Sequence, residues 1–248
     1  METNSHKKLL SDIEEFVKKT MSNNDASHDW NHIKRVRKMA LYLADKENLS
    51  KAESEIVEYA ALMHDVDDWK YSQMPTKYVS NNVVKNIYKN RPEKTSKVKN
   101  FLLTHPNCSD EKMVKILHVI KNVGFRDELR GKTIVTPEIA CVQDADRLDA
   151  IGAIGVARAC IFGAARGRDF LTNGENYDIA NHPKMNITFE EYNKKCDTPT
   201  LNHFYDKLIF IKDLMKTKTG RKIAEKRHNF MLAYLSEINE ELLFDDSR

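Results

Sequence analysis

The chain has 248 residues, of which 41% are hydrophobic and 31% charged, a balance typical of a folded globular protein. Its 40 basic and 37 acidic side chains leave a net charge of +3, so neither nucleic acid nor an anionic membrane is expected as the main partner. No run of about 18 apolar residues or N-terminal apolar segment predicts a membrane span or secretion signal. The four cysteines form no Cys-x-x-Cys pair, which favours reduced thiols in a cytoplasmic protein and leaves a nuclear location open.

Scarce Gly and Pro, at 8 and 6 residues, together with abundant Lys, Glu, Leu and Ala, predict helices. No segment has the alternation of a strand. Apolar spacing predicts helices, in chain order, over about 6–21, 29–48, 51–64, 76–89, 93–104, 110–122, 137–165, 199–216 and 218–243. The longer predicted loops are 66–75, 124–136 and 166–199. We therefore expect one all-α domain over residues 1–248.

The predicted helix over 137–165 is the longest and the most apolar. Pro137 suits its first turn. Gly152 and Gly155 lie among alanines, so a neighbouring helix could approach closely there. These features predict a central, buried helix.

Polar residues interrupt three of these apolar helices. His32 lies directly before an apolar stripe, and His64-Asp65 directly follows an apolar run. Asp146 and Asp149 share one face of the apolar helix, where unpaired carboxylates would be costly. A lone histidine of this kind is more often a core residue, and salt bridges to Arg147 or Arg158 could satisfy the acids.

Taken together, two imidazoles and two carboxylates from separate helices form a mixed nitrogen and oxygen ligand set. Such a set suits one divalent cation, namely Mn²⁺, Fe²⁺, Ni²⁺, Co²⁺ or Mg²⁺. Zinc also accepts these ligands, but no thiolate points to it. The sequence alone does not choose among these ions.

The order His32, His64-Asp65 and Asp146 resembles the signature of the HD-domain metal-dependent phosphohydrolases. The likeness extends to further segments: Val36, Leu62-Met63, and residues 144–155, 203–208 and 212–215. It covers about residues 25–235 and is closest to stand-alone, single-domain bacterial enzymes, some of which are nucleoside triphosphate pyrophosphohydrolases. It implies an all-α HD bundle with a metal site between central helices, an HD core over about 25–165 and C-terminal helices over about 199–243.

The resemblance also implies roles for individual residues. His32, His64, Asp65 and Asp146 would bind the metal. Asp68, four residues after His64, would act as a base or orient the attacking water. Its neighbour Asp67 could take that role instead. No ligand position is missing, so nothing indicates an inactive copy.

Positive groups near the metal would stabilise charge on the phosphates. The candidates for substrate binding are His118, Lys121, Lys70 and Arg35. The simpler alternative is that each lies on a solvated surface, since the chain has 40 basic residues. A further pair, His203 and Lys207, lies one turn apart and could contact substrate from the C-terminal helices.

Asp29 fits the N-cap of the helix that carries His32, while the role of His28 stays open.

The expected function is hydrolysis of phosphate ester or anhydride bonds in nucleotides by a divalent-metal-dependent phosphohydrolase. The finer expectation is a (deoxy)nucleoside triphosphate pyrophosphohydrolase. The alternative is a non-catalytic HD protein that binds or senses metal and nucleotide; a nuclease is disfavoured by the small net charge. We expect a phosphorylated small molecule as the partner, no nucleic acid or membrane, and a monomer or homodimer.

Overall fold

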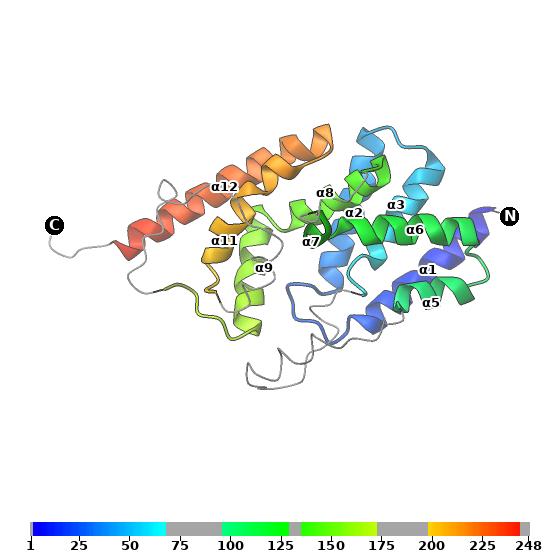
Figure 1. Cartoon of the computed structure of the whole chain (residues 1–248), viewed down its shortest axis with the longest axis horizontal. Coiled ribbons are helices and arrows are strands. Elements are labelled where there is room, and N and C mark those ends of the chain that lie inside the picture. The colour runs from blue at the N-terminus through cyan, green and yellow to red at the C-terminus, as the bar shows by residue number, and fades with distance from the viewer. Residues whose placement is uncertain (1, 68–95, 129–134, 173–197, 244–248) are drawn as a thin grey trace.

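The computed structural model describes residues 2–67, 96–128, 135–172 and 198–243. Within these ranges every regular element is a helix and no strand forms, which confirms the all-α prediction (Figure 1). None of the described helices is by itself both long and apolar enough to cross a membrane.

The helices α1 to α8 form the part of the molecule that carries the N-terminus (Figure 1). They are α1 (Glu2–Thr20), α2 (Trp30–Lys46), α3 (Lys51–Met63), α5 (Lys97–Thr104), α6 (Asp110–Val123), α7 (Phe125–Glu128) and α8 (Pro137–Asp149). The C-terminal part contains α9 (Gly152–Ala165), α11 (Asn202–Asp206), the 3₁₀ helix η2 (Leu208–Leu214) and α12 (Lys218–Leu242). The helix predicted over 76–89 lies outside the described residues.

Side-chain caps explain where most of these helices begin. The Ser50 hydroxyl accepts a hydrogen bond from the Glu53 amide, and the Glu53 carboxylate accepts one from the Ser50 amide, forming a capping box at α3. The predicted cap Asp29 accepts from the His32 amide at 3.0 Å. Four further helices are capped in the same way, by Ser96, Ser109, Thr136 and Thr217. Each cap of this kind contributes about 1 kcal/mol.

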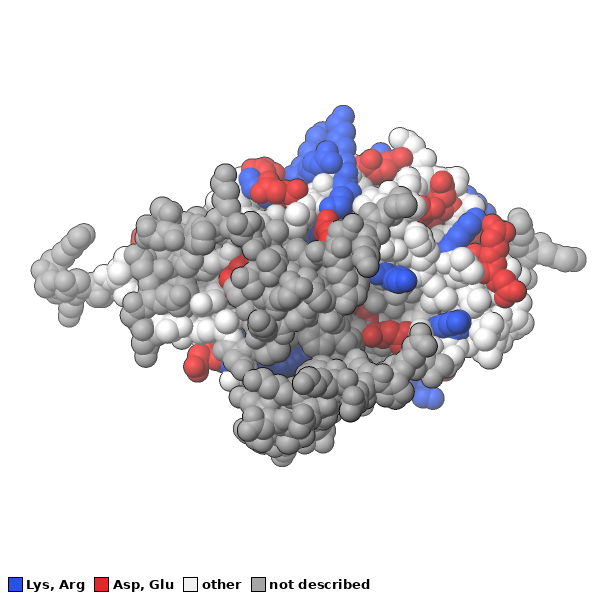
Figure 2. All heavy atoms as spheres, in the orientation of Figure 1, with Lys and Arg blue, Asp and Glu red and all other residues white. Residues whose placement is uncertain are grey.

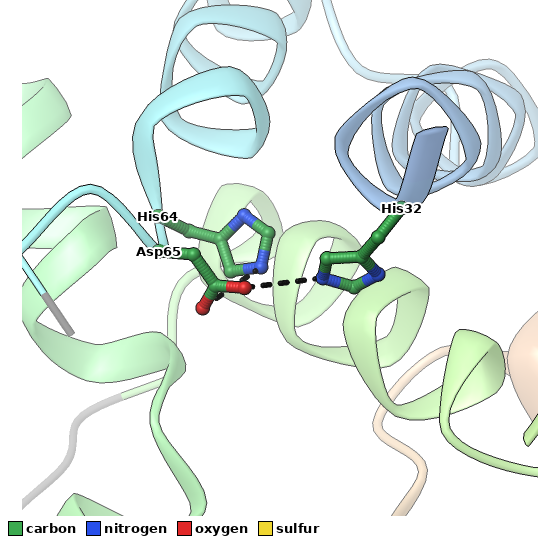
Figure 3. Close-up of side chains that lie close together, drawn as sticks. All are labelled: His32, His64 and Asp65. Carbon is green, nitrogen blue, oxygen red and sulfur yellow. Dashed lines mark ion pairs between the residues drawn. The ribbon is translucent and has the colours of Figure 1, made fainter. Parts of the chain in front are cut away.

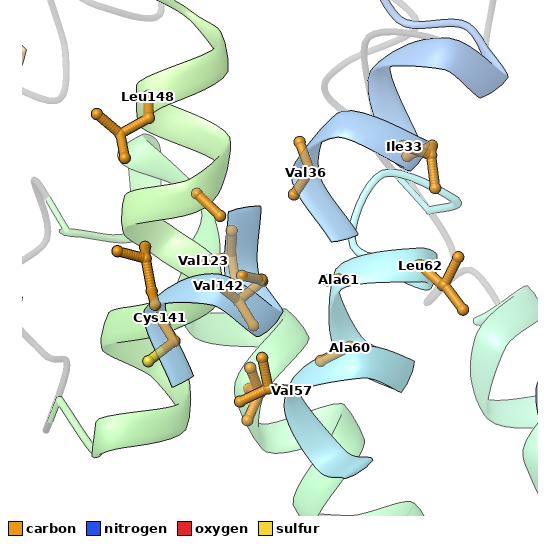
Figure 4. Packing of buried hydrophobic residues seen from close by; sticks show 14 of the residues in the cluster. Ile33, Val36, Val57, Ala60, Ala61, Leu62, Val123, Cys141, Val142 and Leu148 are labelled. Atoms are coloured by element: carbon orange, nitrogen blue, oxygen red, sulfur yellow. The ribbon is translucent and has the colours of Figure 1, made fainter. Parts of the chain in front are cut away.

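The core forms where α2, α3, α6 and α8 pack against one another. Figure 4 shows Val36 of α2 facing Val57 and Ala61 of α3 and Val142 of α8. All four of these side chains are fully buried, and a buried valine contributes about 1.5–3 kcal/mol. One cluster of buried apolar residues extends from Leu9 in α1 to residues of α12. A continuous core fits the expectation of one domain, which stays a prediction.

The prediction of a single helix over 137–165 is wrong, because this segment forms two helices, α8 and α9, which meet at a bend of 71°. Ile151 adopts an extended conformation, and Gly152 has a φ of +76°, in the left-handed region that favours glycine. A Cβ at Gly155 would lie 2.3 Å from the carbonyl oxygen of Ala150. The two glycines therefore allow the bend itself. Close approach by a neighbouring helix occurs at Gly152, which packs on Arg227 of α12.

The helix expected over 199–216 is also divided. The backbone of Lys207 leaves the helical region between α11 and η2. In η2, Leu208 and Ile211 are both buried, as the three-residue repeat of a 3₁₀ helix requires. The predicted loop over 124–136 contains the short helix α7.

Candidate metal centre

Three of the predicted metal ligands meet between α2 and the end of α3. Figure 3 shows the rings of His32 and His64 and the carboxylate of Asp65 directed toward one another. Asp65 Oδ2 lies 3.2 Å from His32 Nε2, and Asp65 Oδ1 lies 3.4 Å from His64 Nε2. One nitrogen or oxygen atom from each side chain falls within 4.8 Å of the others, a spacing that could hold a metal ion.

Asp146 of α8 completes the group of four. Its Oδ1 atom lies 3.6 Å from the Nε2 atoms of both His32 and His64. Its side chain is 32% exposed, whereas those of the two histidines are 0% and 2% exposed. The structure therefore brings together all four predicted ligands, and the centre is most open to solvent on the Asp146 side.

Both histidine rings are held by hydrogen bonds at their other nitrogen. His32 Nδ1 lies 2.7 Å from Asp149 Oδ2, and His64 Nδ1 lies 2.9 Å from the carbonyl oxygen of Ala61. Because a carbonyl oxygen can only accept, the His64 Nδ1–H must be the donor. Each ring then directs Nε2 toward the centre, the arrangement usual for metal-binding histidines.

Three buried polar atoms of this group have no hydrogen-bond partner among the described residues: His32 Nε2, His64 Nε2 and Asp65 Oδ2. Buried polar atoms normally find a partner, because leaving one unpaired costs about 1–3 kcal/mol. Here the three atoms face one another across a space that a small cation would fill. The residues present therefore fit a divalent metal ion with nitrogen and oxygen ligands.

The charges of the centre are strongly coupled. Burial alone would lower the pKa of His64, but Asp65 and Asp146 outweigh it and raise that pKa to about 9. Burial acts in the opposite direction on the two acids, yet the neighbouring histidines hold the pKa of Asp65 and of Asp146 well below the usual range. The acids are therefore ionised, and together they favour a positive charge between them.

Local structure explains how the four side chains reach one place. The Asp29 cap fixes the first turn of α2, which carries His32. His64 is the C-cap of α3, so Asp65 follows where the chain leaves the helix. Asp146 lies in the last turn of α8, which packs on both α2 and α3.

Asp149 is the residue near the centre whose role the sequence did not predict. It accepts hydrogen bonds from Arg35 Nε at 2.7 Å and Arg35 Nη2 at 3.0 Å, and Arg158 Nη1 lies 3.1 Å away. The proposed salt bridge to Arg158 therefore exists, but at Asp149, whereas Asp146 faces the histidines. Two spacings in the sequence could have indicated the contact between Arg35 and Asp149. Asp149 lies three residues after Asp146, and Arg35 lies three residues after His32, so each pair shares one face of its helix.

Arg35 was predicted to bind substrate, and in the structure it pairs with a carboxylate beside the centre. Its guanidinium forms a two-bond pair with Asp149, and its side chain is 37% exposed. Such fork-shaped pairs are among the stronger side-chain interactions. In this position Arg35 supports the Asp149 carboxylate that contacts the His32 ring, and its contact with substrate stays a prediction.

Two of the other predicted site residues, Asp68 and Lys70, lie outside the described residues. Asp67, the alternative to Asp68, accepts hydrogen bonds from the Ser96 hydroxyl at 2.6 Å and from the Lys97 amide at 3.0 Å. Its carboxylate therefore anchors the start of α5. This engagement favours Asp68 over Asp67 for the water-orienting role.

The remaining candidates lie on α6, α11 and the turn before α2. His118 and Lys121 are exposed on α6, as the solvated-surface alternative expects. The Nζ atom of Lys207 lies 4.5 Å from the centre of the Phe125 ring, and His203 lies in the first turn of α11. The ring of His28 lies 5.5 Å from that of His32, so His28 borders the centre.

Comparison with known proteins agrees with this geometry. The HD domain family matches residues 29–151, which include all four predicted ligands. YpgQ of Bacillus subtilis is 32% identical over 238 residues, covering 95% of this chain and 94% of its own. The chain belongs to the HD superfamily. This membership supports metal-dependent phosphohydrolase chemistry in general.

Several solved structures have a similar fold over nearly the whole chain. An HD-superfamily hydrolase from Bacillus thuringiensis is 31% identical with a TM-score of 0.60, covering 95% of this chain and 97% of its own. A Lactobacillus plantarum protein has a TM-score of 0.72 at 27% identity, with coverages of 96% and 98%. YpgQ in complex with ADP is 30% identical with a TM-score of 0.64, with coverages of 94% and 98%.

Proposed function

We propose that this HD protein hydrolyses phosphate ester or anhydride bonds of nucleotides. More specifically, it would act as a (deoxy)nucleoside triphosphate pyrophosphohydrolase. The observation that carries the proposal is the group of two histidines and two aspartates, in which three buried atoms find no hydrogen-bond partner in the described part of the chain. The ADP complex of YpgQ supports a nucleotide as the substrate class. The enzyme would use one divalent ion as its cofactor, for which Mn²⁺, Fe²⁺, Ni²⁺, Co²⁺ and Mg²⁺ are the candidates.

Phosphate bonds hydrolyse slowly because water must attack a centre that is already anionic. A bound divalent cation supplies charge neutralisation at a phosphoryl oxygen and lowers the pKa of a water molecule. His32, His64, Asp65 and Asp146 would hold that ion with Nε2 and carboxylate oxygens. Since Asp146 is the most exposed of the four, substrate and water would enter on its side.

The other proposed roles belong to residues around the four ligands. Asp68 would accept the proton of the attacking water or align that water. Lys70, His118 and Lys121 would stabilise negative charge on the phosphates. Asp149 and Arg35 would keep the His32 ring in place, and the contact of Arg35 with substrate stays a prediction.

A nucleotide screen with Mn²⁺ tests the proposal, with phosphate and pyrophosphate measured separately. We expect one group of nucleotides to be hydrolysed, with pyrophosphate as the product of triphosphates. Release of phosphate alone would exclude the pyrophosphohydrolase and keep the broader hydrolase. A protein that binds Mn²⁺ and nucleotide but releases neither product would instead be the non-catalytic sensor.

A cytoplasmic location and a monomeric or homodimeric state remain predictions from the sequence. On the face shown in Figure 2, basic and acidic side chains of the described residues lie beside one another. This mixture agrees with the small net charge and with a small molecule, rather than nucleic acid, as the proposed partner.

A further inference from the structure

We propose that Asp149 is a positioning residue that fixes the ring of His32 for metal binding. This inference rests on the proposed metal centre and names a residue outside the four ligands. A carboxylate held by two arginines can only accept hydrogen bonds, so the His32 nitrogen beside it must donate. The His32 ring then carries its hydrogen on Nδ1 and presents the lone pair of Nε2 to the centre.

The geometry around Asp149 is complete for such a role. Its side chain is 7% exposed, and both oxygen atoms are used. Oδ2 accepts hydrogen bonds from His32 Nδ1 at 2.7 Å and from Arg35 Nη2 at 3.0 Å. Oδ1 accepts one from Arg35 Nε at 2.7 Å. Arg158 Nη1, 3.1 Å from Oδ2, adds a second positive charge. Both arginines stabilise the ionised carboxylate that the His32 nitrogen needs as an acceptor.

The bend between α8 and α9 links the Asp149 carboxylate to the segment that precedes His32. Asp149 is the last residue of α8, directly before the 71° bend, and Arg158 comes from α9 beyond it. Arg158 Nε also donates to the carbonyl oxygen of Ser27 at 2.6 Å, just before α2. Arg158 is the sole charged residue of α9 and is buried. The bend thus places one arginine where it contacts both the carboxylate and the segment that leads into His32.

A purely structural role is the alternative, in which the Asp149 ion pairs join α2, α8 and α9 and have no effect on the metal. Asp144 provides a matched control, because it is a second buried aspartate of α8. Its carboxylate accepts from the amide of Lys216 and from the amide and hydroxyl of Thr217, away from the four ligands. Replacing either aspartate by asparagine removes a buried charge from the same helix.

The test is direct titration of the metal-free full chain with Mn²⁺, using the wild type, Asp149→Asn and Asp144→Asn. Mutation of a residue that hydrogen-bonds a metal-binding histidine typically lowers metal affinity by about 10–100-fold. We expect a loss of Mn²⁺ affinity in that range for Asp149→Asn. Asp144→Asn should lower the melting temperature and leave the Mn²⁺ affinity within about twofold, since its partners lie outside the centre. Wild-type affinity in Asp149→Asn, or an equal loss in Asp144→Asn, would overturn the positioning role.

Arg35→Met keeps the test decisive if Asp149→Asn does not fold. It leaves Asp149 and His32 in place but removes the two-bond pair, so Mn²⁺ affinity should fall by a smaller factor. Arg37→Met, on the same helix, loses its pairs with Glu58 and Glu14 and should leave the affinity unchanged. Equal affinities in these two variants would overturn the proposal. A wild-type chain that binds no Mn²⁺ would instead overturn the proposed metal centre, and this inference with it.

Discussion

Asp144 and Asp146 lie two residues apart on α8, yet their surroundings differ in kind. The Asp144 side chain is completely buried and receives hydrogen bonds from Lys216 and Thr217. Asp146 is partly exposed and faces His32 and His64, whose Nε2 atoms have no hydrogen-bond partner within the described ranges. Two residues on a helix are about 200° apart, so the two carboxylates point to opposite sides of α8.

The pKa values of the two acids follow this difference. Burial raises the pKa of Asp144, and its hydrogen-bond donors offset only part of that effect. At Asp146 the effect of burial is overcome by His64, and the pKa is lowered. A buried acid that the protein satisfies with its own donors is structural. A partly exposed acid beside imidazoles with unpartnered atoms indicates a binding site for a cation.

The largest effect should come from replacing the acid on the open side. Asp146→Ala removes a proposed ligand, so Mn²⁺ affinity should fall by more than the roughly 100-fold of an outer-shell change, and turnover should be lost. Elemental analysis and a phosphate-release assay measure the two effects. Retained activity with one equivalent of metal would remove Asp146 from the ligand set.

Asp68→Asn should separate catalysis from metal binding. If Asp68 handles the proton of the attacking water, its loss should lower kcat by about 10²–10⁴-fold while Mn²⁺ content stays at the wild-type level. The comparison requires kcat and metal content on the same preparation. An unchanged kcat would exclude Asp68 from the mechanism, and Asp67→Asn would then be the next variant to assay.

Metal affinity should increase with pH. In the metal-free protein the pKa of His64 is raised from 6.5 to about 9, so its protonated form stabilises the fold fully below about 6.5, and this contribution is lost as the pH rises through 9. A metal must displace that proton, so Mn²⁺ affinity should rise between these limits, by up to about tenfold per pH unit. Calorimetry in two buffers of different ionisation enthalpy measures the proton released. Affinity independent of pH from 6.5 to 9 would contradict this charge state of His64.

The smallest expected effect lies on the opposite side of α8. Asp144→Asn leaves the Lys216 and Thr217 donors poorly paired and should lower the free energy of unfolding by about 1–3 kcal/mol. Urea denaturation of the metal-free protein measures the loss. A change in stability below about 0.5 kcal/mol would show that the structural role assigned to Asp144 is wrong.

Much of this architecture could be predicted from the sequence because apolar spacing determines which helix faces are buried. The all-α class, the Asp29 cap and the segments that meet at the centre all follow from local patterns. The division between α8 and α9 could not be predicted, since Ala150, Ile151 and Gly152 are also compatible with a continuous helix. The positive φ of Gly152 occurs where α12 packs against the bend, which is a tertiary effect.

The site residues show the same limit. The resemblance of residue type and order to the HD signature selected His32, His64, Asp65 and Asp146 as the expected ligand set. They did not distinguish an arginine that contacts only phosphate from one that also pairs with a carboxylate, so the Asp149 partner of Arg35 was not predicted. That distinction depends on which side chain the fold places opposite the guanidinium, and α8 places Asp149 there.

The central claim is that His32, His64, Asp65 and Asp146 hold one divalent ion. A crystal structure of the Mn²⁺-loaded protein, with anomalous scattering recorded at the manganese edge, tests it most directly. We predict one strong anomalous peak, bonded by Nε2 of both histidines and by a carboxylate oxygen of each aspartate. A Mn²⁺-soaked crystal with no peak among these four side chains would contradict the account.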